Sequence, residues 1–293
     1  DTTSLWYGSG NKLTKLQGIK FPHSIGLLYS AITSYIGFKV NSGEYKVMGL
    51  APYGEPKYVE TIKKHLLEID DDGMFRLNMT FFDFAVSGQM TNKKLHSIFD
   101  HSPREPESEI TQFEMDVARS IQDVVEEMMI GLARNLKKLT GSANLCLAGG
   151  VALNCVGNGK LLRENIFENM WIQPAAGDAG GSVGAALNYY FDVLGNKRNT
   201  NNIDLMKGSY LGPEYSDEQI KEYLNKVGAD YTHYEKFEDV IDIATEELKK
   251  EKVIGWHQGR MEFGPRSLGA RSILGDPRSQ KMQKTMNLKI KFR

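Results

Sequence analysis

The stretch from residue 143 to residue 191 alternates twice between a short apolar run and a helical pattern, with glycines at each junction. Apolar runs at 143–148 and 170–174 predict buried strands. A helix follows each strand, the first from about Leu153 and the second at 182–191. Because consecutive parallel strands need a crossover helix between them, this stretch predicts a βαβα unit and a parallel sheet. The predicted fold class is therefore α/β.

Three further elements are predicted before the βαβα unit. Residues 3–21 have the pattern of a hairpin around a Ser-Gly-Asn turn, and residues 23–37 that of an apolar helix with Ser24 as a possible cap. From residue 113 to residue 140, apolar residues recur every three or four positions, which predicts a long amphipathic helix. Together with the βαβα unit, these elements form a predicted first domain at 1–195.

The chain after the βαβα unit predicts a second domain. The polar stretch 196–208 is typical of a linker. Helices near 216–227 and 240–250, followed by a strand at 252–258, then predict an α+β unit. We therefore assign the second domain to residues 209–293.

The amino-acid composition of the chain limits the kinds of binding partner that we expect. The 293 residues are 41% hydrophobic and 25% charged, with a formal net charge of -1. No basic block is long enough for a polyanion-binding tail, so nucleic acid is not an expected partner, although a charge count does not address a local basic cleft. Apolar runs stay below the roughly 18 residues of a membrane span and no signal sequence is evident, so we expect a cytoplasmic protein without a membrane partner. Cys146 and Cys155 lie among apolar or small residues, which predicts buried, reduced thiols.

Two glycine clusters follow the predicted strands. Gly149 and Gly150 would present bare backbone N–H groups at a helix start, which suits a phosphate. A tight strand-to-helix turn is the alternative. In the second cluster, Asp178 stands among glycines that include Gly180 and Gly181, so its carboxylate could reach a metal or a ribose. The alternative is that Asp178 caps the following helix.

A third motif brings arginines and glycines together. Arg260, Arg266 and Arg271 lie within twelve residues and alternate with glycines and a proline, which predicts a loop. Several guanidinium groups on one loop can bind a doubly charged phosphate and stabilise charge that develops on it. The alternative is a solvated basic loop tied to Glu262 and Asp276.

Long motifs over nearly the whole chain resemble the ATP-dependent O-carbamoyltransferases of the nodulation-factor, cephamycin and aminoglycoside-antibiotic type. The resemblance implies an actin-like ATPase fold of ribonuclease-H-type subdomains, followed by part of a second domain that resembles threonylcarbamoyl-adenylate synthase. It also implies two steps: carbamoyl phosphate and ATP give carbamoyl-adenylate and pyrophosphate, and the carbamoyl group then passes to a hydroxyl of a small molecule or sugar. The stretches that carry the resemblance are "PHSIGLLYSAITSYIGFKVNSGEYKVMGLAPYG", "GGVALN", "QPAAGDAGGSVGAAL" and "GRMEFGPRSLGARSILGDPR".

The resemblance also implies roles for particular residues. Gly149, Gly150 and Asn154 match the family's nucleotide loop, and Asp178 matches a ligand of its divalent metal, iron or magnesium. The histidines that complete the family's metal site belong to a segment that would precede Asp1, and the family continues past the last residue, so the chain resembles an internal segment.

The resemblance extends the expected nucleotide site to a second segment. It places Glu44 and Lys46 at the ATP, whereas the residues alone are equally typical of a helix with an exposed ion pair. Gly180 and Gly181 of the second glycine cluster are expected to belong to the same nucleotide site. Two other functions stay open: a different actin-like ATPase such as a sugar kinase, and a nucleotide-binding interaction domain without turnover. The acceptor and the oligomeric state are not indicated by the sequence.

Overall fold

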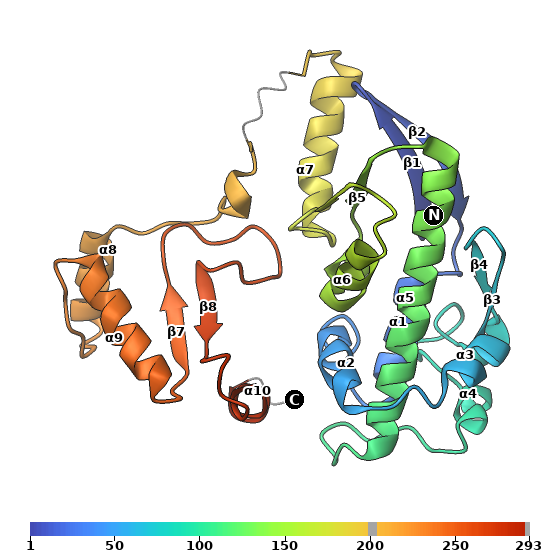
Figure 1. Cartoon of the computed structure of the whole chain (residues 1–293), viewed down its shortest axis with the longest axis horizontal. Helices are drawn as coiled ribbons and strands as arrows, with labels where there is room; N and C mark the ends of the chain where they lie inside the picture. The colour runs from blue at the N-terminus through green and yellow to red at the C-terminus, as the bar shows by residue number, and fades with distance from the viewer. Residues whose placement is uncertain (199–203, 291–293) are drawn as a thin grey trace. The chain divides into compact units, whose positions relative to one another are not determined.

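The computed structural model describes residues 1–198 and 204–290 and has a mixed α/β secondary structure with small sheets. The chain divides into two compact units, residues 1–199 and 200–293, which we describe separately (Figure 1). Residues 199–203 of the predicted linker and residues 291–293 of the predicted second domain lie outside the described residues. The actin-like and adenylate-synthase assignments stay predictions.

Unit 1 is built mainly from helices around one long helix, α5, together with three strand pairs among the described residues (Figure 1). Its helices and strands are β1 (Thr3–Ser9), β2 (Lys12–Ile19), α1 (Ile25–Tyr35), α2 (Glu44–Leu50), α3 (Val59–Leu66), β3 (Leu67–Ile69), β4 (Phe75–Leu77), α4 (Lys93–Ile98), α5 (Gln112–Thr140), β5 (Asn144–Leu147), α6 (Cys155–Arg163), β6 (Asn169–Ile172) and α7 (Ala179–Asn188). Short 3₁₀ turns include η1 (Ala51–Tyr53), η2 (Met79–Phe81) and η3 (Gly150–Leu153).

Helix α5 confirms the predicted long amphipathic helix. Its start is fixed by a capping box, in which Thr111 and Glu114 bond each other's backbone N–H groups, and it ends at Gly141. The apolar stripe includes Val117, Ile121 and Met128, none of which is exposed to solvent. Burying a side chain of this size stabilises a fold by about 1.5–3 kcal/mol. The stripe packs against α1, α2, α3, α6, η1 and β1, so α5 organises the core of unit 1.

The predicted N-terminal hairpin and the helix after it are confirmed. Strands β1 and β2 pair antiparallel, with Thr3 opposite Ile19. Ser24 caps α1, because its hydroxyl accepts a hydrogen bond from the Leu27 N–H.

The predicted βαβα unit is also confirmed. Strands β5 and β6 pair in parallel around α6, with Leu145 opposite Met170, and α7 follows β6. Leu145 packs on Ile130 and Ala133 of α5, which forms a second, smaller core. This packing holds β5 and β6 against the same helix that carries the main core.

The prediction of buried thiols is wrong, because both Cys146 and Cys155 are exposed. Side chains alternate between the faces of a strand, so Leu145 faces α5 while Cys146 faces the other side of the sheet. Cys155 is the first residue of α6, and its Sγ lies 3.8 Å from Sδ of Met48. Apolar neighbours in sequence therefore do not determine burial here.

Unit 2 contains α8 (Asp217–Lys226), α9 (Phe237–Lys249), β7 (Ile254–His257), β8 (Arg271–Leu274) and α10 (Met282–Thr285). A capping box between Ser216 and Gln219 starts α8. The predicted helices and the β7 strand are confirmed. Strand β8, which pairs antiparallel with β7, was not predicted, because its residues belong to the glycine- and arginine-rich motif.

The tight approach of Gly54 to α5 provides a test of this packing. A Cβ at Gly54 would overlap the backbone carbonyl of Met115, so we expect Gly54→Ala to lower the free energy of unfolding by about 1–3 kcal/mol. Gly88→Ala is the matched control, because a Cβ at Gly88 meets no atom within 4 Å. Urea unfolding of the two variants and the wild type measures the difference. Equal midpoints for all three proteins would contradict the packing.

Candidate functional site

The glycine loop, residues 149–154, joins the end of β5 to α6. Gly149 has φ +99° and ψ 160°, a conformation that residues with a side chain rarely adopt. A Cβ at Gly149 or Gly150 would meet no atom within 4 Å, so the space around both backbones is open. The N–H groups at the start of a helical segment have no acceptor within that segment. The loop can therefore be approached closely by a ligand that accepts hydrogen bonds.

The second glycine turn, residues 173–181, lies beside the glycine loop. The N–H of Gly149 donates to the carbonyl of Ala176 at 2.7 Å, which ties the two turns together. This arrangement follows from the parallel pairing of β5 and β6, because the carboxyl ends of parallel strands meet at one edge of a sheet. Gly180 is needed for packing, since a Cβ there would overlap the carbonyl of Ala175, whereas the space at Gly181 is open.

Asp178 is exposed at the start of α7 and does not cap it. The residue has helical backbone angles, and its side chain accepts no capping hydrogen bond. The alternative role of Asp178 as a helix cap is therefore wrong. Within residues 1–198 and 204–290, no group of three His, Cys, Asp or Glu side chains is placed to hold a metal ion. The role of Asp178 as a metal ligand stays a prediction.

Asn154 faces the protein rather than the open side of the loop. Its Oδ1 accepts a hydrogen bond from the Gly157 N–H at 3.0 Å, which caps α6. The same Oδ1 also accepts from Nε2 of Gln122 on α5, and Nδ2 of Asn154 donates to Oε1 of Gln122. Sequence reasoning missed Gln122, although an amide in the apolar stripe of α5, next to Ile121, is a signal that could have found it.

Helices α1 and α2 border the glycine loop. A Cβ at Gly26 of α1 would lie 3.7 Å from Val151, and Met48 of α2 touches the first residue of α6. Glu44 starts α2, where its Oε1 accepts hydrogen bonds from the Ser30 hydroxyl at 2.7 Å and the Asn41 N–H at 2.9 Å. Lys46 lies over the ring of Phe38, 5.7 Å from its centroid.

The alternative of an ion pair between Glu44 and Lys46 does not hold in the described chain, where Glu44 has these polar partners and Lys46 an aromatic one. The structure thus brings the α2 segment close to the glycine loop. It leaves the predicted contact of Glu44 and Lys46 with ATP untested.

The arginine loop, residues 258–271, belongs to unit 2. Arg260 donates to the carbonyl of Gly212 and pairs with Glu214, whereas Arg271 donates to the carbonyls of Gln258, Gly259 and Ala270. Arg266 lies between these two residues in the sequence and is half-buried. Arg260 and Arg271 therefore share a loop, but their contacts in this structure go to different backbone segments.

The arginine loop is organised around the buried carboxylate of Glu262. Its Oε1 accepts hydrogen bonds from the N–H groups of Leu268 at 2.7 Å and Ala270 at 2.9 Å, and from that of Arg271 at 3.3 Å. Burial alone would raise the pKa of this carboxyl, but these donors outweigh it and lower the pKa to about 2.

The alternative that ties the basic loop to Glu262 and Asp276 is confirmed for Glu262, which binds backbone N–H groups of the loop, but not for the side chains of Arg260 and Arg271. Their guanidinium groups bond elsewhere. Asp276 instead pairs with Arg278, whose hydrogen bonds lower the pKa of that carboxyl to about 2.

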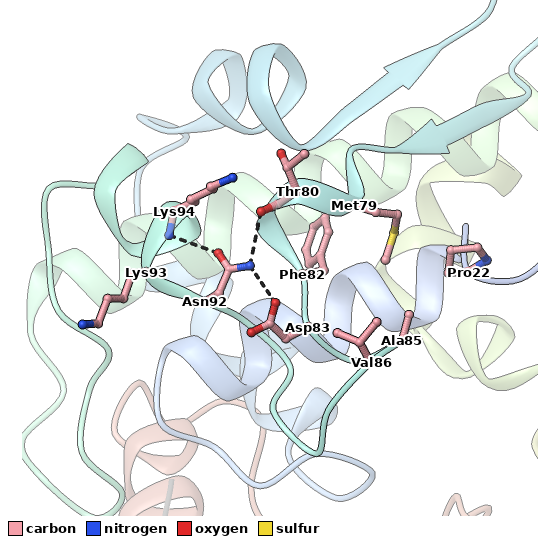
Figure 2. A pocket seen from close by; sticks show the side chains of 10 residues that line it. All are labelled: Pro22, Met79, Thr80, Phe82, Asp83, Ala85, Val86, Asn92, Lys93 and Lys94. Atoms are coloured by element: carbon pink, nitrogen blue, oxygen red, sulfur yellow. Dashed lines mark hydrogen bonds between the residues drawn. The ribbon is translucent and has the colours of Figure 1, made fainter.

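A surface pocket of about 610 Å³ lies in unit 1, and none of the predicted site residues line it. Figure 2 shows that Asn92 bonds within the pocket wall, donating to Thr80 and Asp83 and accepting from the Lys94 N–H. Both polar groups of the Asn92 amide are therefore occupied by hydrogen bonds within the wall. Its lining consists of Pro22, Met79, Thr80, Phe82, Asp83, Ala85, Val86, Asn92, Lys93 and Lys94.

Comparison with known families identifies the chain. Residues 1–187 match the family model described as carbamoyltransferase N-terminus, and residues 245–293 match that described as carbamoyltransferase C-terminus. The chain therefore belongs to the carbamoyltransferase family. This confirms the resemblance found in the motifs.

Relatives agree with this placement. The chain is 57% identical to an uncharacterised protein of Synechocystis, over all of this chain and 48% of the relative. It is 36% identical to the nodulation protein NolO of Bradyrhizobium diazoefficiens, over 98% of this chain and 49% of the relative. It is 37% identical to the nodulation protein NolNO of Sinorhizobium fredii, over 98% of this chain and 40% of the relative. The chain spans about half the length of the curated relatives it matches.

None of the helices in residues 1–198 and 204–290 combines the length and the apolar character needed to cross a bilayer.

The low pKa of Glu262 gives a test of the arginine loop. A carboxyl whose folded pKa of about 2 lies below its ordinary value of 4.5 adds stability above pH 4.5, which is lost as pH falls toward 2. We expect Glu262→Gln to destabilise the protein by about 1–3 kcal/mol at pH 7, and by less at pH 3. Denaturant unfolding at both pH values measures this.

Glu246→Gln is the control for that experiment. Glu246 lies on the surface of α9 and pairs with Lys249, so its loss should change stability little at either pH. A Glu262→Gln variant that is as stable as the wild type at pH 7 would contradict the assigned role of Glu262.

Proposed function

We propose that the protein is an ATP-dependent O-carbamoyltransferase that forms carbamoyl-adenylate from carbamoyl phosphate and ATP and passes the carbamoyl group to a hydroxyl of a small molecule or sugar. The observation that carries this proposal is the match of both parts of the chain to the two halves of the carbamoyltransferase family. The open glycine loop in unit 1 and the arginine loop in unit 2 supply chemistry that fits the two steps.

Unit 1 would hold the nucleotide. In this proposal the phosphates of ATP or of the adenylate approach the bare backbone of Gly149 and Gly150, which leaves room for them. Because the Gly149 N–H is bonded to Ala176, the donors to the phosphates would come from the helical turn that starts at Gly150. Gly181 borders the same edge of the sheet. Glu44 and Lys46 lie on α2, which contacts α6 next to the loop, and so could line the nucleotide from that side.

A divalent metal is part of the family resemblance, and Asp178 is the residue proposed to bind it. Asp178 is exposed and its carboxylate makes no capping bond, so it could serve as a ligand. The described residues place no cluster of three possible ligands that would complete such a site. Asp178 alone would not hold the metal, whether iron or magnesium, and further ligands would have to complete the site.

Unit 2 would bind carbamoyl phosphate. Water first attacks the carbamoyl carbon of carbamoyl phosphate, the carbon–oxygen bond to the phosphate breaks, and carbamate and inorganic phosphate form with loss of a proton. A carbamate oxygen then attacks the α-phosphorus of ATP, and pyrophosphate leaves. Arg260, Arg266 and Arg271 would hold the phosphate and stabilise the negative charge that grows on it as the carbon–oxygen bond breaks.

The second step transfers the carbamoyl group. The acceptor hydroxyl oxygen attacks the carbamoyl carbon, AMP leaves, and the hydroxyl proton is lost. A sugar kinase has no need of a second phosphate site, so the match of residues 245–293 to the C-terminal family model favours the transferase over a kinase.

The first test of this proposal is Gly150→Arg in the full-length protein. A long side chain should fill the phosphate approach without disturbing the fold, because the space around Gly150 is open. We expect ATP affinity to fall by at least about tenfold while thermal stability is kept. Gly88→Arg is the matched control at another open glycine of unit 1. Equal ATP affinity in the Gly150 variant and the wild type would rule out this nucleotide site.

The second test separates the two steps. Replacing Arg260 or Arg266 by Lys should slow pyrophosphate release from carbamoyl phosphate and ATP by about a hundredfold, because an ammonium does not reproduce a two-pronged guanidinium contact. Transfer from supplied carbamoyl-adenylate should continue. Arg278→Lys, which changes the pair with Asp276 in the same unit, should leave both steps near the wild-type rate. If both steps fell together in the folded Arg260 and Arg266 variants, the arginines would have a structural role instead.

A further inference from the structure

Gln122 of α5 is a buried amide in the middle of the helix's apolar stripe. Only 1% of the residue is exposed. Its Nε2 donates to Glu126 Oε1 at 2.8 Å and to Asn154 Oδ1 at 3.1 Å. Its Oε1 accepts from the Tyr29 hydroxyl and from Asn154 Nδ2, both at 3.0 Å. An amide has two donor hydrogens and two acceptor lone pairs, so every one of them is used.

The contact between Gln122 and Asn154 is reciprocal, because each amide donates to the other's oxygen. Two neighbouring groups, each of which has only one possible hydrogen-bonding role, determine the orientation of the two amides. The carboxylate of Glu126 can only accept, so it requires the Nε2 of Gln122, and the Gly157 N–H can only donate, so it requires the Oδ1 of Asn154. Rotating either amide by half a turn would place like groups against each other.

The surroundings keep the phenol of Tyr29 protonated and give Glu126 a second partner. Burial raises the pKa of Tyr29 well above its ordinary value, and the carboxylates of Glu44 and Glu126 add to the rise, so the phenol keeps the proton that it donates. The second oxygen of Glu126 lies 3.0 Å from the ammonium of Lys160 on α6. The buried Glu126 carboxylate is therefore paired as well as hydrogen-bonded.

The network ends at the glycine loop. Asn154 is the last residue of the loop and the cap of α6, so its side chain sets where the loop stops and the helix starts. Because Gln122 lies on the rigid α5 helix and Tyr29 on α1, the loop is held from beneath by two packed helices.

We propose that Gln122 is a positioning residue that holds the glycine loop, through Asn154, in the conformation that receives the nucleotide phosphates. This inference rests on the proposed nucleotide site at Gly149 and Gly150. Gln122 does not touch the nucleotide itself. It keeps the N–H donors of the loop oriented before the ligand arrives, which reduces the cost of ordering them on binding.

The experiment compares Gln122→Leu with Asn135→Leu in the full-length protein. Asn135 is a matched control, because it is also a buried amide on α5 but donates to Gln17 of β2, away from the loop. Each change removes a buried amide and should lower the melting temperature. Only Gln122→Leu should weaken ATP binding, by about tenfold to a hundredfold, since it leaves the Asn154 amide without its partner.

A double-variant cycle tests whether Gln122 acts through Asn154. If it does, ATP affinity of Gln122→Leu with Asn154→Ala should be no lower than that of Asn154→Ala alone. If the loss of ATP affinity in the double variant equalled the product of the losses in the two single variants, the inference would be overturned. Tyr29→Phe removes only the hydroxyl that donates to Gln122, and should weaken ATP binding by about twofold to tenfold even if Gln122→Leu fails to fold. Wild-type affinity in a folded Tyr29→Phe variant would then count against the inference.

The results separate this inference from the proposed function. If Gly150→Arg abolishes ATP binding while folded Gln122→Leu binds ATP as the wild type does, the inference is wrong and the nucleotide site stands. If neither change affects ATP binding, the nucleotide site is wrong and the inference falls with it. Equal losses of affinity in Gln122→Leu and Asn135→Leu would show a general effect of destabilising α5, which also overturns the inference.

Discussion

The burial of one face of α5 is the constraint on which the rest of unit 1 depends. The 29 residues of this helix contact β1 of the hairpin, helices α1, α2 and α3 of the main core, and α6 next to the glycine loop. Ile130 and Ala133 of the same helix pack against Leu145 of β5. Segments more than a hundred residues apart in sequence are thereby positioned by a single rigid element, and the glycine loop takes its place from that element.

Both candidate sites are glycine-rich segments held by a buried polar side chain. In unit 1 the amide of Gln122 bonds Asn154 at the end of the glycine loop. In unit 2 the carboxylate of Glu262 accepts N–H groups of the arginine loop. A glycine-rich backbone has little side-chain packing to hold it, so hydrogen bonds from a buried group give it a defined shape. The same arrangement leaves the opposite side of the glycine loop free for a ligand.

Patterns that act over a few residues were readable from the sequence, and contacts across the chain were not. The period of α5, the cap at Ser24 and the parallel βαβα unit depend on neighbouring residues, and all three were predicted correctly. The partner of Gln122 is 32 residues away, so no local pattern indicates it. The exposure of Cys146 depends on which face of β5 is covered by helix α5. Strand β8 was not predicted, because the glycine-rich segment around it is typical of a loop. The sequence therefore indicated the candidate site residues that lie in glycine-rich turns. It did not indicate Gln122, the buried side chain that supports one of these turns from another part of the chain.

The central claim is that the phosphates of the nucleotide lie against the glycine loop of unit 1. Its most direct test is an experimental structure of the full-length protein with a non-hydrolysable ATP analogue. We expect phosphate oxygens within hydrogen-bonding distance of the Gly150 N–H, with the Gln122–Asn154 amide pair intact below the loop. Phosphates bound elsewhere, for instance in the pocket lined by Met79 and Phe82, with the glycine loop empty, would contradict the claim.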